Sequence, residues 1–386
     1  MKNDWTRGHY TLYRLIFGCY LFIHFLQLLP WCSELFSSQG LIQNGSSSPI
    51  LHLFPNILSL NDSPLFTTAL ALLGAIGALF FMSGKFDRIA AAWIWYLLAC
   101  FLGRNPLIAN PSLPFVGWLL LAHLFVPKKV FFNWSLPRPL FLSAWVVMSL
   151  AYSYSGMLKL ESPSWVDGTA LSYLLQNPLI RCNALRDLLL TAPASLLKAM
   201  TWGTLSLEIL FAPLSLVKRL RPWIWSAMLL MHAALLGLIN FSDLTWGMII
   251  IHLFTFDPGW IKPRPIKEKL FVYYDGTCGF CHSFVRFVLS ENKQRLPFRF
   301  ASLQGRGDSI TVETKEGVLI KSRAVFQILS HLGGFWRLLA LLLSVIPKQL
   351  SDWAYDLVAR IRHRIFAKPK NECPIIPVEM REFFDF

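Results

Sequence analysis

The stretch Leu-Phe-Val-Tyr-Tyr-Asp-Gly-Thr-Cys-Gly-Phe-Cys-His, residues 270–282, separates a long apolar sequence from one of mixed composition. Its first five residues are apolar, aromatic and β-branched, as in a buried strand. Asp275 and Gly276 then break the strand with residues typical of turns. Apolar side chains recur at helical spacing between positions 280 and 288. The stretch therefore predicts a strand, a tight turn and a helix that opens with the pair Cys278 and Cys281.

A dithiol at a strand-to-helix junction is typical of thioredoxin-like chemistry. The backbone N–H groups and the positive end of the helix dipole favour a thiolate at Cys278, which we expect to be the solvent-facing nucleophile. Cys281 lies three residues further on the same face and is expected to be the resolving thiol. Asp275 is either a proton acceptor for Cys278 or a residue that only forms the turn.

Two other interpretations of the cysteines remain open. The pair can be half of a zinc site, with His282 or Cys373 as further ligands. It can also be two unreactive cysteines of a core. Zinc sites usually combine two closely spaced pairs of ligands, and the sequence offers no second closely spaced pair of cysteines.

The sequence after the dithiol predicts the order β-α-β-β-β-α, or the same order with one strand fewer. Strands are expected at 298–302, 310–313 and 318–320, and Ser322 is expected to cap a helix over 323–332. An apolar segment, 336–346, is expected to pack on the sheet or to lie on a membrane leaflet. An amphipathic helix over 350–366 is expected to present a solvated basic face or to dock on anionic lipid. A loose tail is expected over 375–386.

Residues 268–377 resemble the DCC family of thiol-disulfide oxidoreductase-like proteins, which is named for the Asp-x-x-Cys-x-x-Cys motif seen here at Asp275, Cys278 and Cys281. Further matching segments are Leu332-Gly333-Gly334, Trp336-Arg337, Ile346-Pro347, 355–360 and Cys373-Pro374. The resemblance implies a thioredoxin-like fold and a protein-disulfide reductase activity. No proline lies in the segment directly ahead of residues 310–313, where thioredoxins proper carry a cis-proline loop.

The whole chain is too apolar for a soluble protein. Of its residues 54% are hydrophobic and 15% are charged, whereas about a quarter of the residues in a soluble domain are charged. The net charge is +14, and the basic residues gather at the ends of apolar runs. That pattern favours anionic lipid headgroups over nucleic acid as the partner. We expect a multi-pass membrane domain over 1–260, a basic linker over 261–269, a thioredoxin-like domain over 270–377 and a tail over 378–386.

About eight membrane spans are expected, and the first is too long for a cleavable signal peptide. They are residues 10–29, 65–82, 89–102, 114–126, 140–157, 202–217, 223–241 and 244–256. The third and fourth are short, so they are full spans or a re-entrant pair. Positive residues mark the loops near 85, 128, 219 and 264, while 31–64 and 242–243 have none. The positive-inside rule then places both termini and the dithiol in the cytoplasm, on the inner side of the cell membrane. There the expected partners are the bilayer and a thiol or disulfide redox partner.

Ionisable residues inside the expected spans are candidate functional groups, because their burial in lipid is unfavourable. They are Arg14, His24, His123, Glu208, His232 and His252. Arg14 can snorkel to the interface, and each histidine is either a neutral hydrogen-bonding partner or a catalyst. For Glu208 we expect an interaction with His232, or a protonated carboxyl bonded to the backbone.

Lys159 follows the fifth expected span and is either a base favoured by partial desolvation or an interfacial anchor. Its neighbours include Gly156, which permits close helix packing, and the run Trp165-Val166-Asp167-Gly168. Residues 8–260 resemble the HTTM domain, which is shared with vitamin K-dependent γ-carboxylases. The matching motif consists of Lys159 and these neighbours together with Tyr154, Leu160 and Glu161.

The resemblance to the carboxylases implies that Lys159 is the base that deprotonates vitamin K hydroquinone. Glu208, His232, Trp165 and Gly168 are the candidate residues of the quinone site. Leu158 stands where the carboxylases carry the first of two adjacent lysines, and one extra residue precedes Trp165. A quinone-related membrane chemistry is therefore expected, with carboxylation as an alternative.

The sequence predicts a membrane-bound thiol-disulfide oxidoreductase whose membrane domain acts on a quinone or lipid-like substrate. The alternatives are a carboxylase-like enzyme, or a transporter or scaffold that carries a redox-sensing or zinc-binding tail.

Overall fold

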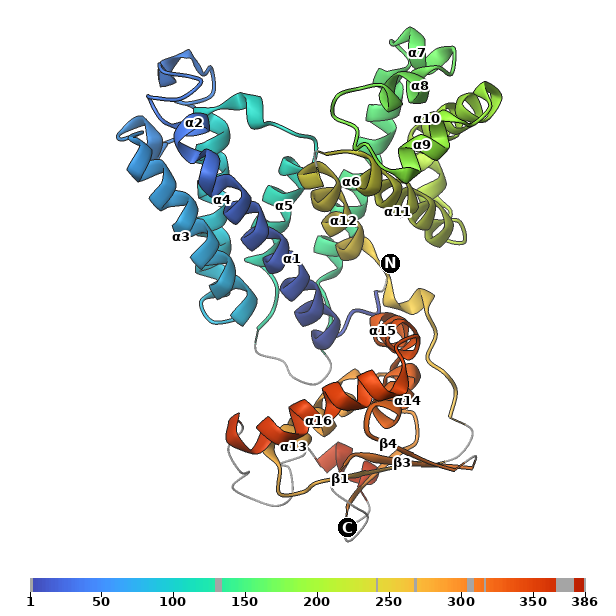
Figure 1. Ribbon diagram of the computed structural model, residues 1–386. Coiled ribbons are helices and arrows are strands. Elements are labelled where there is room, and N and C mark those ends of the chain that lie inside the picture. The colour runs from blue at the N-terminus through green and yellow to red at the C-terminus, as the bar shows by residue number, and fades with distance from the viewer. Residues whose placement is uncertain are drawn as a thin grey trace. The chain divides into compact units, whose positions relative to one another are not determined.

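The structure is a computed structural model that describes residues 3–128, 134–240, 242–266, 269–303, 309–315, 317–365 and 378–384. The chain forms two compact units (Figure 1). The first, here called the helical unit, comprises Leu12–Val126 and Pro137–Phe256. The second, the sheet unit, comprises Asp257–Phe386 together with Lys2–Thr11 and Pro127–Leu136.

The helical unit is built from apolar helices of very different lengths. Several begin with proline in their first turn, where its missing N–H removes no hydrogen bond. In chain order the helices are α1 Arg7–Leu28, α2 Cys32–Phe36, α3 Pro64–Ser83, α4 Asp87–Arg104, α5 Leu113–His123, α6 Arg138–Lys159, α7 Pro163–Val166, α8 Ala170–Leu175, α9 Ala184–Leu190, α10 Ala194–Leu216, α11 Arg221–Leu238 and α12 Ser242–Thr255. The main helix pairs are α6 with α10 and α3 with α4.

Four stretches are long and apolar enough to cross a membrane: Arg7–Phe36, Pro64–Ser83, Arg138–Lys159 and Ala194–Leu216. They contain the first, second and fifth expected spans and nearly all of the sixth. The other four expected spans are largely helical too, as α4, α5, α11 and α12, but fall short in length or hydropathy. The 11 residues of α5 extend only about 16 Å, against about 30 Å of hydrocarbon. The number eight therefore stays a prediction.

The sheet unit contains a mixed four-stranded sheet. Its strands are β1 Leu270–Tyr274, β2 Phe298–Ser302, β3 Thr311–Thr314 and β4 Gly317–Ile320, in the order β2-β1-β3-β4. β1 runs parallel to β2 and antiparallel to β3, and β4 is antiparallel to β3. The helices are α13 Gly279–Glu291, α14 Lys321–Leu332, α15 Gly334–Ser344 and α16 Lys348–Ile365. The predicted order β-α-β-β-β-α is confirmed.

The sheet core consists of apolar residues that alternate along the strands. Val272 of β1 faces Phe300 and Val312 on its two neighbours, and all three side chains are fully buried. Helix α13 contacts α14 and α16, and Figure 1 shows α14 and α16 on one face of the sheet. The short link between β1 and α13 thus lies at the end of β1, one of the two inner strands of the sheet.

Two details of the sheet unit differ from the prediction. Ser322 does not cap α14, because the helix begins one residue earlier, at Lys321, whose φ is +54°. Its hydroxyl instead donates to Asp352 Oδ1 at 2.5 Å. The expected loose tail is also wrong for residues 378–384, which form the 3-10 helix Val378–Phe383 and a bridge from Phe384 to Phe300 of β2. Residues 375–377 lie outside the described ranges.

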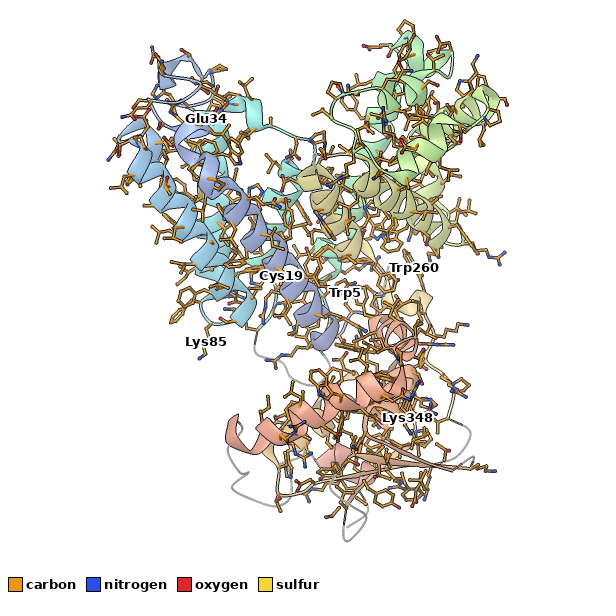
Figure 2. All side chains as sticks on the ribbon, in the orientation of Figure 1. Trp5, Cys19, Glu34, Lys85, Trp260 and Lys348 are labelled. Carbon is orange, nitrogen blue, oxygen red and sulfur yellow. The ribbon has the colours of Figure 1, made fainter. Side chains whose placement is uncertain are left out.

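Residues near the N-terminus are part of the sheet unit. Glu291, at the end of α13, accepts hydrogen bonds from Thr6 Oγ1, from Gly8 N at 2.9 Å and from Trp336 Nε1 at 2.7 Å. Burial raises the pKa of the Glu291 carboxyl, although these donors oppose the shift. Trp5, labelled in Figure 2, is fully buried and meets the ring of Phe335 edge-on. The carboxyl group therefore joins the N-terminal segment to α13 and α15.

Candidate functional site

The dithiol lies where the sequence predicts it, at the turn between β1 and α13. Cys278 is the N-cap residue of α13, with extended backbone angles, and its Sγ accepts a hydrogen bond from Cys281 N at 3.4 Å. Asp275 Oδ1 accepts from Thr277 N at 2.9 Å and from Thr277 Oγ1 at 2.7 Å. Asp275 therefore forms the turn with one carboxylate oxygen, and the other oxygen faces a cation described below.

The exposure of the two cysteines differs from the prediction. Cys278 is only 1% exposed, so the expectation that it faces solvent is wrong, and Cys281 is half-buried. The reason is the cap geometry, since the Cys278 sulfur folds back over the first turn of α13 to accept the N–H of Cys281.

The two thiols also differ in their electrostatic surroundings. Burial, with a smaller contribution from the hydrogen bond to Cys278, raises the pKa of the Cys281 thiol to about 12. Cys281 therefore stays protonated near neutral pH, as suits a resolving thiol. The helix N-terminus favours the thiolate form of a cysteine at the cap. The roles of Cys278 as nucleophile and Cys281 as resolving thiol stay predictions.

Arg362 of α16 completes the site and was not singled out from the sequence. Its Nη1 lies 3.5 Å from Cys281 Sγ, and its Nη2 lies 3.4 Å from Asp275 Oδ2. The residue is 7% exposed, and its charge lowers the pKa of Cys281 against the effect of burial. The sequence interpretation assigned it to the basic face of the amphipathic helix. Its position eleven and seven residues after two inward-facing residues, Ser351 and Tyr355, places it on the same side of the helix and is the signal that would have found it.

The zinc interpretation has partial support from the geometry. One ligand atom each from Asp275, Cys278 and Cys281 lie within 4.8 Å of one another. His282, a predicted ligand, instead places Nε2 2.7 Å from the carbonyl oxygen of Gly276. The other predicted ligand, Cys373, lies outside the described residues. A structural zinc ion usually takes four protein ligands, so these three residues make an incomplete set.

The candidate residues of the helical unit fall into two groups. Lys159, at the end of α6, donates to Glu208 Oε2 of α10 at 2.5 Å and to Ser155 Oγ at 2.8 Å. Its Nζ also lies 5.2 Å from the ring centroid of Trp165. Gly168 is close by in sequence, with a φ of +84° that favours glycine. Three of the predicted residues, Lys159, Glu208 and Trp165, therefore form one cluster.

The expected pair of Glu208 and His232 is not formed. His232 Nε2 lies 2.6 Å from Tyr152 Oη, while the Glu208 carboxylate is bonded to Lys159. Close packing of α6 on α10 explains the choice of partner. A Cβ atom at Gly156 would lie 2.7 Å from the backbone nitrogen of Ile209, so only glycine allows this approach. Lys159, one turn further along, is thereby brought to Glu208.

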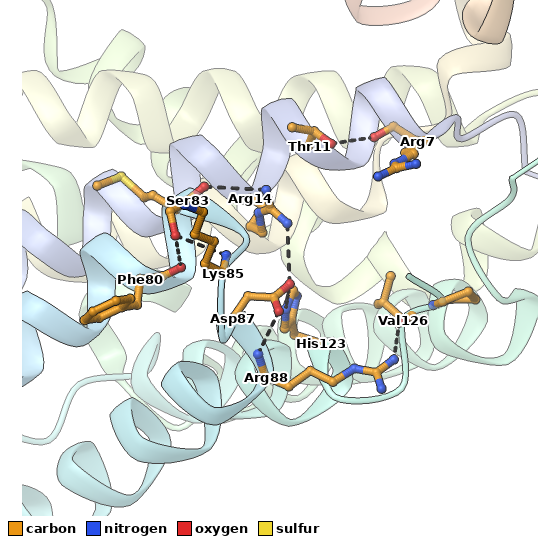
Figure 3. Close-up of polar contacts among 12 residues, drawn as sticks. Arg7, Thr11, Arg14, Phe80, Ser83, Lys85, Asp87, Arg88, His123 and Val126 are labelled. Carbon is orange, nitrogen blue, oxygen red and sulfur yellow. Dashed lines mark hydrogen bonds and ion pairs between the residues drawn. The ribbon is translucent and has the colours of Figure 1, made fainter. Parts of the chain in front are cut away.

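Two aspartates that the sequence analysis did not single out contact three more of the predicted ionisable residues, whereas His252 Nδ1 lies 2.8 Å from the carbonyl oxygen of Met248. Asp87 begins α4, and its Oδ2 lies 3.4 Å from Arg14 Nη1 and 3.2 Å from His123 Nε2. The three side chains are drawn in Figure 3. Asp243 Oδ1 lies 2.8 Å from His24 Nδ1. Arg14, His24 and His123 thus contact carboxylates of neighbouring helices, which is how polar groups are usually satisfied within a helix bundle.

Comparison with known proteins identifies part of the chain. The DCC1-like thiol-disulfide oxidoreductase family matches residues 272–368. The uncharacterized protein YuxK of Bacillus subtilis (strain 168) is 31% identical over 126 residues, which are 29% of this chain and 90% of YuxK. The uncharacterized protein YitO of the same organism is 35% identical over 128 residues, 30% of this chain and 41% of YitO. No solved structure matches the chain.

Proposed function

Since the chain belongs, through its C-terminal residues, to the DCC1-like thiol-disulfide oxidoreductase family, we propose that Cys278 and Cys281 are its redox-active pair. The observation that carries this proposal is the position of Cys278 as the N-cap of α13, with Cys281 three residues away and Arg362 beside it. The strand order β2-β1-β3-β4, with one parallel and two antiparallel pairings, suits a thioredoxin-like domain.

The proposed reaction is a two-step exchange with a disulfide of a partner. The Cys278 thiolate attacks one sulfur of that disulfide, and the other partner sulfur leaves as a thiolate that takes up a proton. Cys281 then loses its proton and attacks the Cys278 sulfur of the mixed disulfide. This step releases the second partner thiol and forms the Cys278–Cys281 disulfide, so two electrons pass to the partner. An external thiol restores the reduced pair by the reverse steps.

Each residue of the site has a role in this exchange. The N-terminal end of α13 stabilises the Cys278 thiolate in the first step. Arg362 lies 3.5 Å from Cys281 Sγ and stabilises the thiolate that must form there in the second step. Asp275 orients Arg362 through its Oδ2 and holds the turn through its Oδ1.

A redox titration of the purified full-length chain tests the proposal. The chain is equilibrated in thiol–disulfide buffers, free thiols are alkylated, and the Cys278–Cys281 peptide is quantified by mass spectrometry. We expect reversible formation of this disulfide at a potential between about −270 and −120 mV, the range of known dithiol oxidoreductases. Metal analysis is done on the same sample. A pair that never oxidises in this range, or that retains one zinc ion per chain, contradicts the proposal.

The candidate spans also support a membrane-bound protein. Our further proposal that both termini lie in the cytoplasm rests on the positive residues of the loops near 85, 128, 219 and 264. The test is labelling of intact cells with a membrane-impermeant thiol reagent, in a chain from which the exposed Cys19 and Cys182 have been removed. Ser47→Cys is expected to react from outside and Lys315→Cys is not. Labelling of Lys315→Cys alone would reverse the orientation and the compartment of the dithiol.

A second, membrane-embedded activity is supported by the Lys159 cluster. A hydroquinone bound there would present a weakly acidic hydroxyl group, and a neutral lysine could remove its proton. Glu208, 2.5 Å from Lys159 Nζ, is placed to hold a proton that Lys159 gives up, and the Trp165 ring borders the amine. Lys159→Arg keeps the ion pair but cannot deprotonate near neutral pH. We expect this variant to retain abundance and to lose consumption of vitamin K hydroquinone. Full consumption by the variant would leave Lys159 as an anchor only.

A further inference from the structure

Helix α16 has two faces of opposite character. The face toward the sheet carries Ser351, Tyr355 and Arg362, of which Tyr355 accepts a hydrogen bond from Ile310 N at 2.9 Å. The opposite face is apolar and exposed, at positions spaced three, four and seven apart, as on one side of a helix. Its residues are Leu350, Trp353, Leu357, Val358 and Ile361, with exposed fractions from 39% to 57%.

The end of α15 and the residues that follow add to this exposed apolar surface. Leu341 is 57% exposed, Leu342 70% and Val345 82%. A soluble domain normally turns the apolar side of an amphipathic helix toward its own core. Here the polar side faces the core and the redox site, and the apolar side faces outward. We call these exposed residues of α15 and α16, with Val345, the apolar face. Large apolar side chains exposed in such number on neighbouring helices of the chain point to a binding surface.

The charges around the apolar face have one sign. Lys348, labelled in Figure 2 at the start of α16, and Arg360 are exposed. The acidic residues of α15 and α16 are Asp352 and Asp356. Asp352 accepts the hydroxyl of Ser322, and Asp356 pairs with Lys321 at 2.8 Å, so both are occupied within the sheet unit. Exposed leucine and tryptophan flanked by unpaired basic residues is the pattern of a helix that lies in a membrane interface.

We propose that the apolar face of α15 and α16 lies on the surface of an anionic lipid bilayer. The chain contains helices that can cross a bilayer, so the sheet unit is tethered near one and its effective concentration there is high. A second copy of the chain is a less suitable occupant. A twofold contact through this face would place Lys348 and Arg360 near their own counterparts, with no acidic residue of the face to offset them.

This arrangement has a consequence for the dithiol. Arg362, which contacts Cys281, lies on the inward side of the helix whose outward side rests on lipid. The helix is about 10 Å across, so the redox pair is held about that far from the lipid surface. Disulfides of membrane-anchored partners near the bilayer then fall within its reach, whereas those of freely diffusing proteins are not concentrated there.

Photolabelling of the full-length chain in proteoliposomes tests the proposal. The vesicles contain a lipid with a photoreactive group near its headgroup, and labelled peptides are located by mass spectrometry. We expect strong labelling of residues 350–361 in vesicles with phosphatidylglycerol. The matched internal control is Val318 of β4, which is 60% exposed but lies outside the apolar face and is expected to stay unlabelled. The double variant Leu350→Ser, Leu357→Ser is expected to lose the label, and Val318→Ser is expected to keep it.

The charge requirement is tested separately. Lys348→Gln and Arg360→Gln are each expected to lower the ratio of docked to undocked protein about fivefold in anionic vesicles, and to have no effect in vesicles of phosphatidylcholine alone. The proposal is overturned if wild-type residues 350–361 are labelled no more than the peptide around Val318. It is also overturned if these residues cross-link to a second copy in place of lipid.

Discussion

Arg362→Ala removes the cation that contacts both Cys281 and Asp275, and we expect it to slow the second step of disulfide exchange. Two unit charges about 4 Å apart attract by about 1 kcal/mol in water and about 4 kcal/mol at the effective dielectric of a partly buried site. The side chain of Arg362 is 8% exposed, so an intermediate value of about 2 kcal/mol is reasonable. Since the cation favours the thiolate, its removal raises the pKa of Cys281 further, by about 1.5 units.

The effect on rate is smaller than the effect on pKa. Each unit of pKa above the ambient pH lowers the thiolate fraction tenfold, but a more basic thiolate is about threefold more nucleophilic. A rise of about 1.5 units therefore slows the attack of Cys281 on the mixed disulfide about sevenfold. The full range of about 1 to 4 kcal/mol corresponds to about twofold to fortyfold.

The assay follows both steps in one experiment. The reduced chain is mixed with oxidised glutathione, quenched at intervals and analysed by mass spectrometry for the Cys278–glutathione adduct and for the internal disulfide. In Arg362→Ala we expect the adduct to form at a nearly unchanged rate and to persist about sevenfold longer. Arg360→Ala, an exposed arginine on the same helix, is the control and should match the wild type. Equal adduct lifetimes in all three proteins would refute the role of Arg362, and equal slowing of both steps would indicate a folding defect.

Three further predictions concern single groups. Cys281→Ser should trap a stable mixed disulfide through Cys278 that is detected by mass spectrometry, whereas faster capture through Cys281 in Cys278→Ser would reverse the two roles. Because the pKa of Glu291 is raised, the folded state binds the proton of this carboxyl more tightly than the unfolded state does. The resulting stabilisation is present below the unfolded pKa of about 4.5 and is lost as pH rises through the folded pKa. Glu291→Gln should therefore flatten the fall of the thermal unfolding midpoint with rising pH, and an unchanged slope would assign that fall to other groups. Lys159→Met should lower stability in detergent by about 2 kcal/mol, because it leaves the buried Glu208 without its cation while Lys159 itself is partly exposed. A loss of similar size in Lys218→Met would show that the effect is not specific to the pair.

The parts of the fold that follow from local sequence were predictable. The strand, turn and helix around the dithiol depend on the thirteen residues 270–282, and the hairpin of β3 and β4 depends on ten residues. The strand order β2-β1-β3-β4 does not follow from local sequence, because β1 lies between the consecutive strands β2 and β3. Contacts between distant segments were not predictable in the same way. Arg362 is 81 residues from Cys281, and the sequence of α16 does not indicate which side of this helix contacts the dithiol.

The orientation of α16 differs from the general rule that the apolar side of an amphipathic helix faces the protein core. A helix with an apolar stripe is expected to turn that stripe inward, which would have left Arg362 in solvent. The rule assumes water as the only outside medium. In a protein with helices that can cross a membrane, the outside of a soluble unit includes a lipid surface, where exposed leucine and tryptophan are favourable.

The partner of Glu208 depended on a similar long-range factor. Its distance to each candidate partner is set by how closely α6 and α10 approach, and this depends on Gly156, 52 residues before Glu208 in the chain. The sequence analysis recognised Gly156 as a close-packing residue, and the structure supports that. It had no means to fix the rotation of α10, which turns Glu208 toward Lys159 and leaves His232 to Tyr152.

The two candidate sites differ in what could connect them. Thiol exchange requires sulfur atoms in contact, and the dithiol and Lys159 belong to separate units of the chain. If both termini are cytoplasmic, as we propose, Lys159 follows an odd number of expected spans. Lys159 and the dithiol would then be separated by a hydrocarbon layer about 30 Å thick, too far for direct exchange. Electrons passing from one to the other would need a carrier that dissolves in lipid and is reduced or oxidised at both surfaces. A quinone has both properties, and the apolar face of α15 and α16 would hold the dithiol at the surface where such a carrier arrives. The membrane docking of the sheet unit is thus the element on which any coupling of the two activities depends.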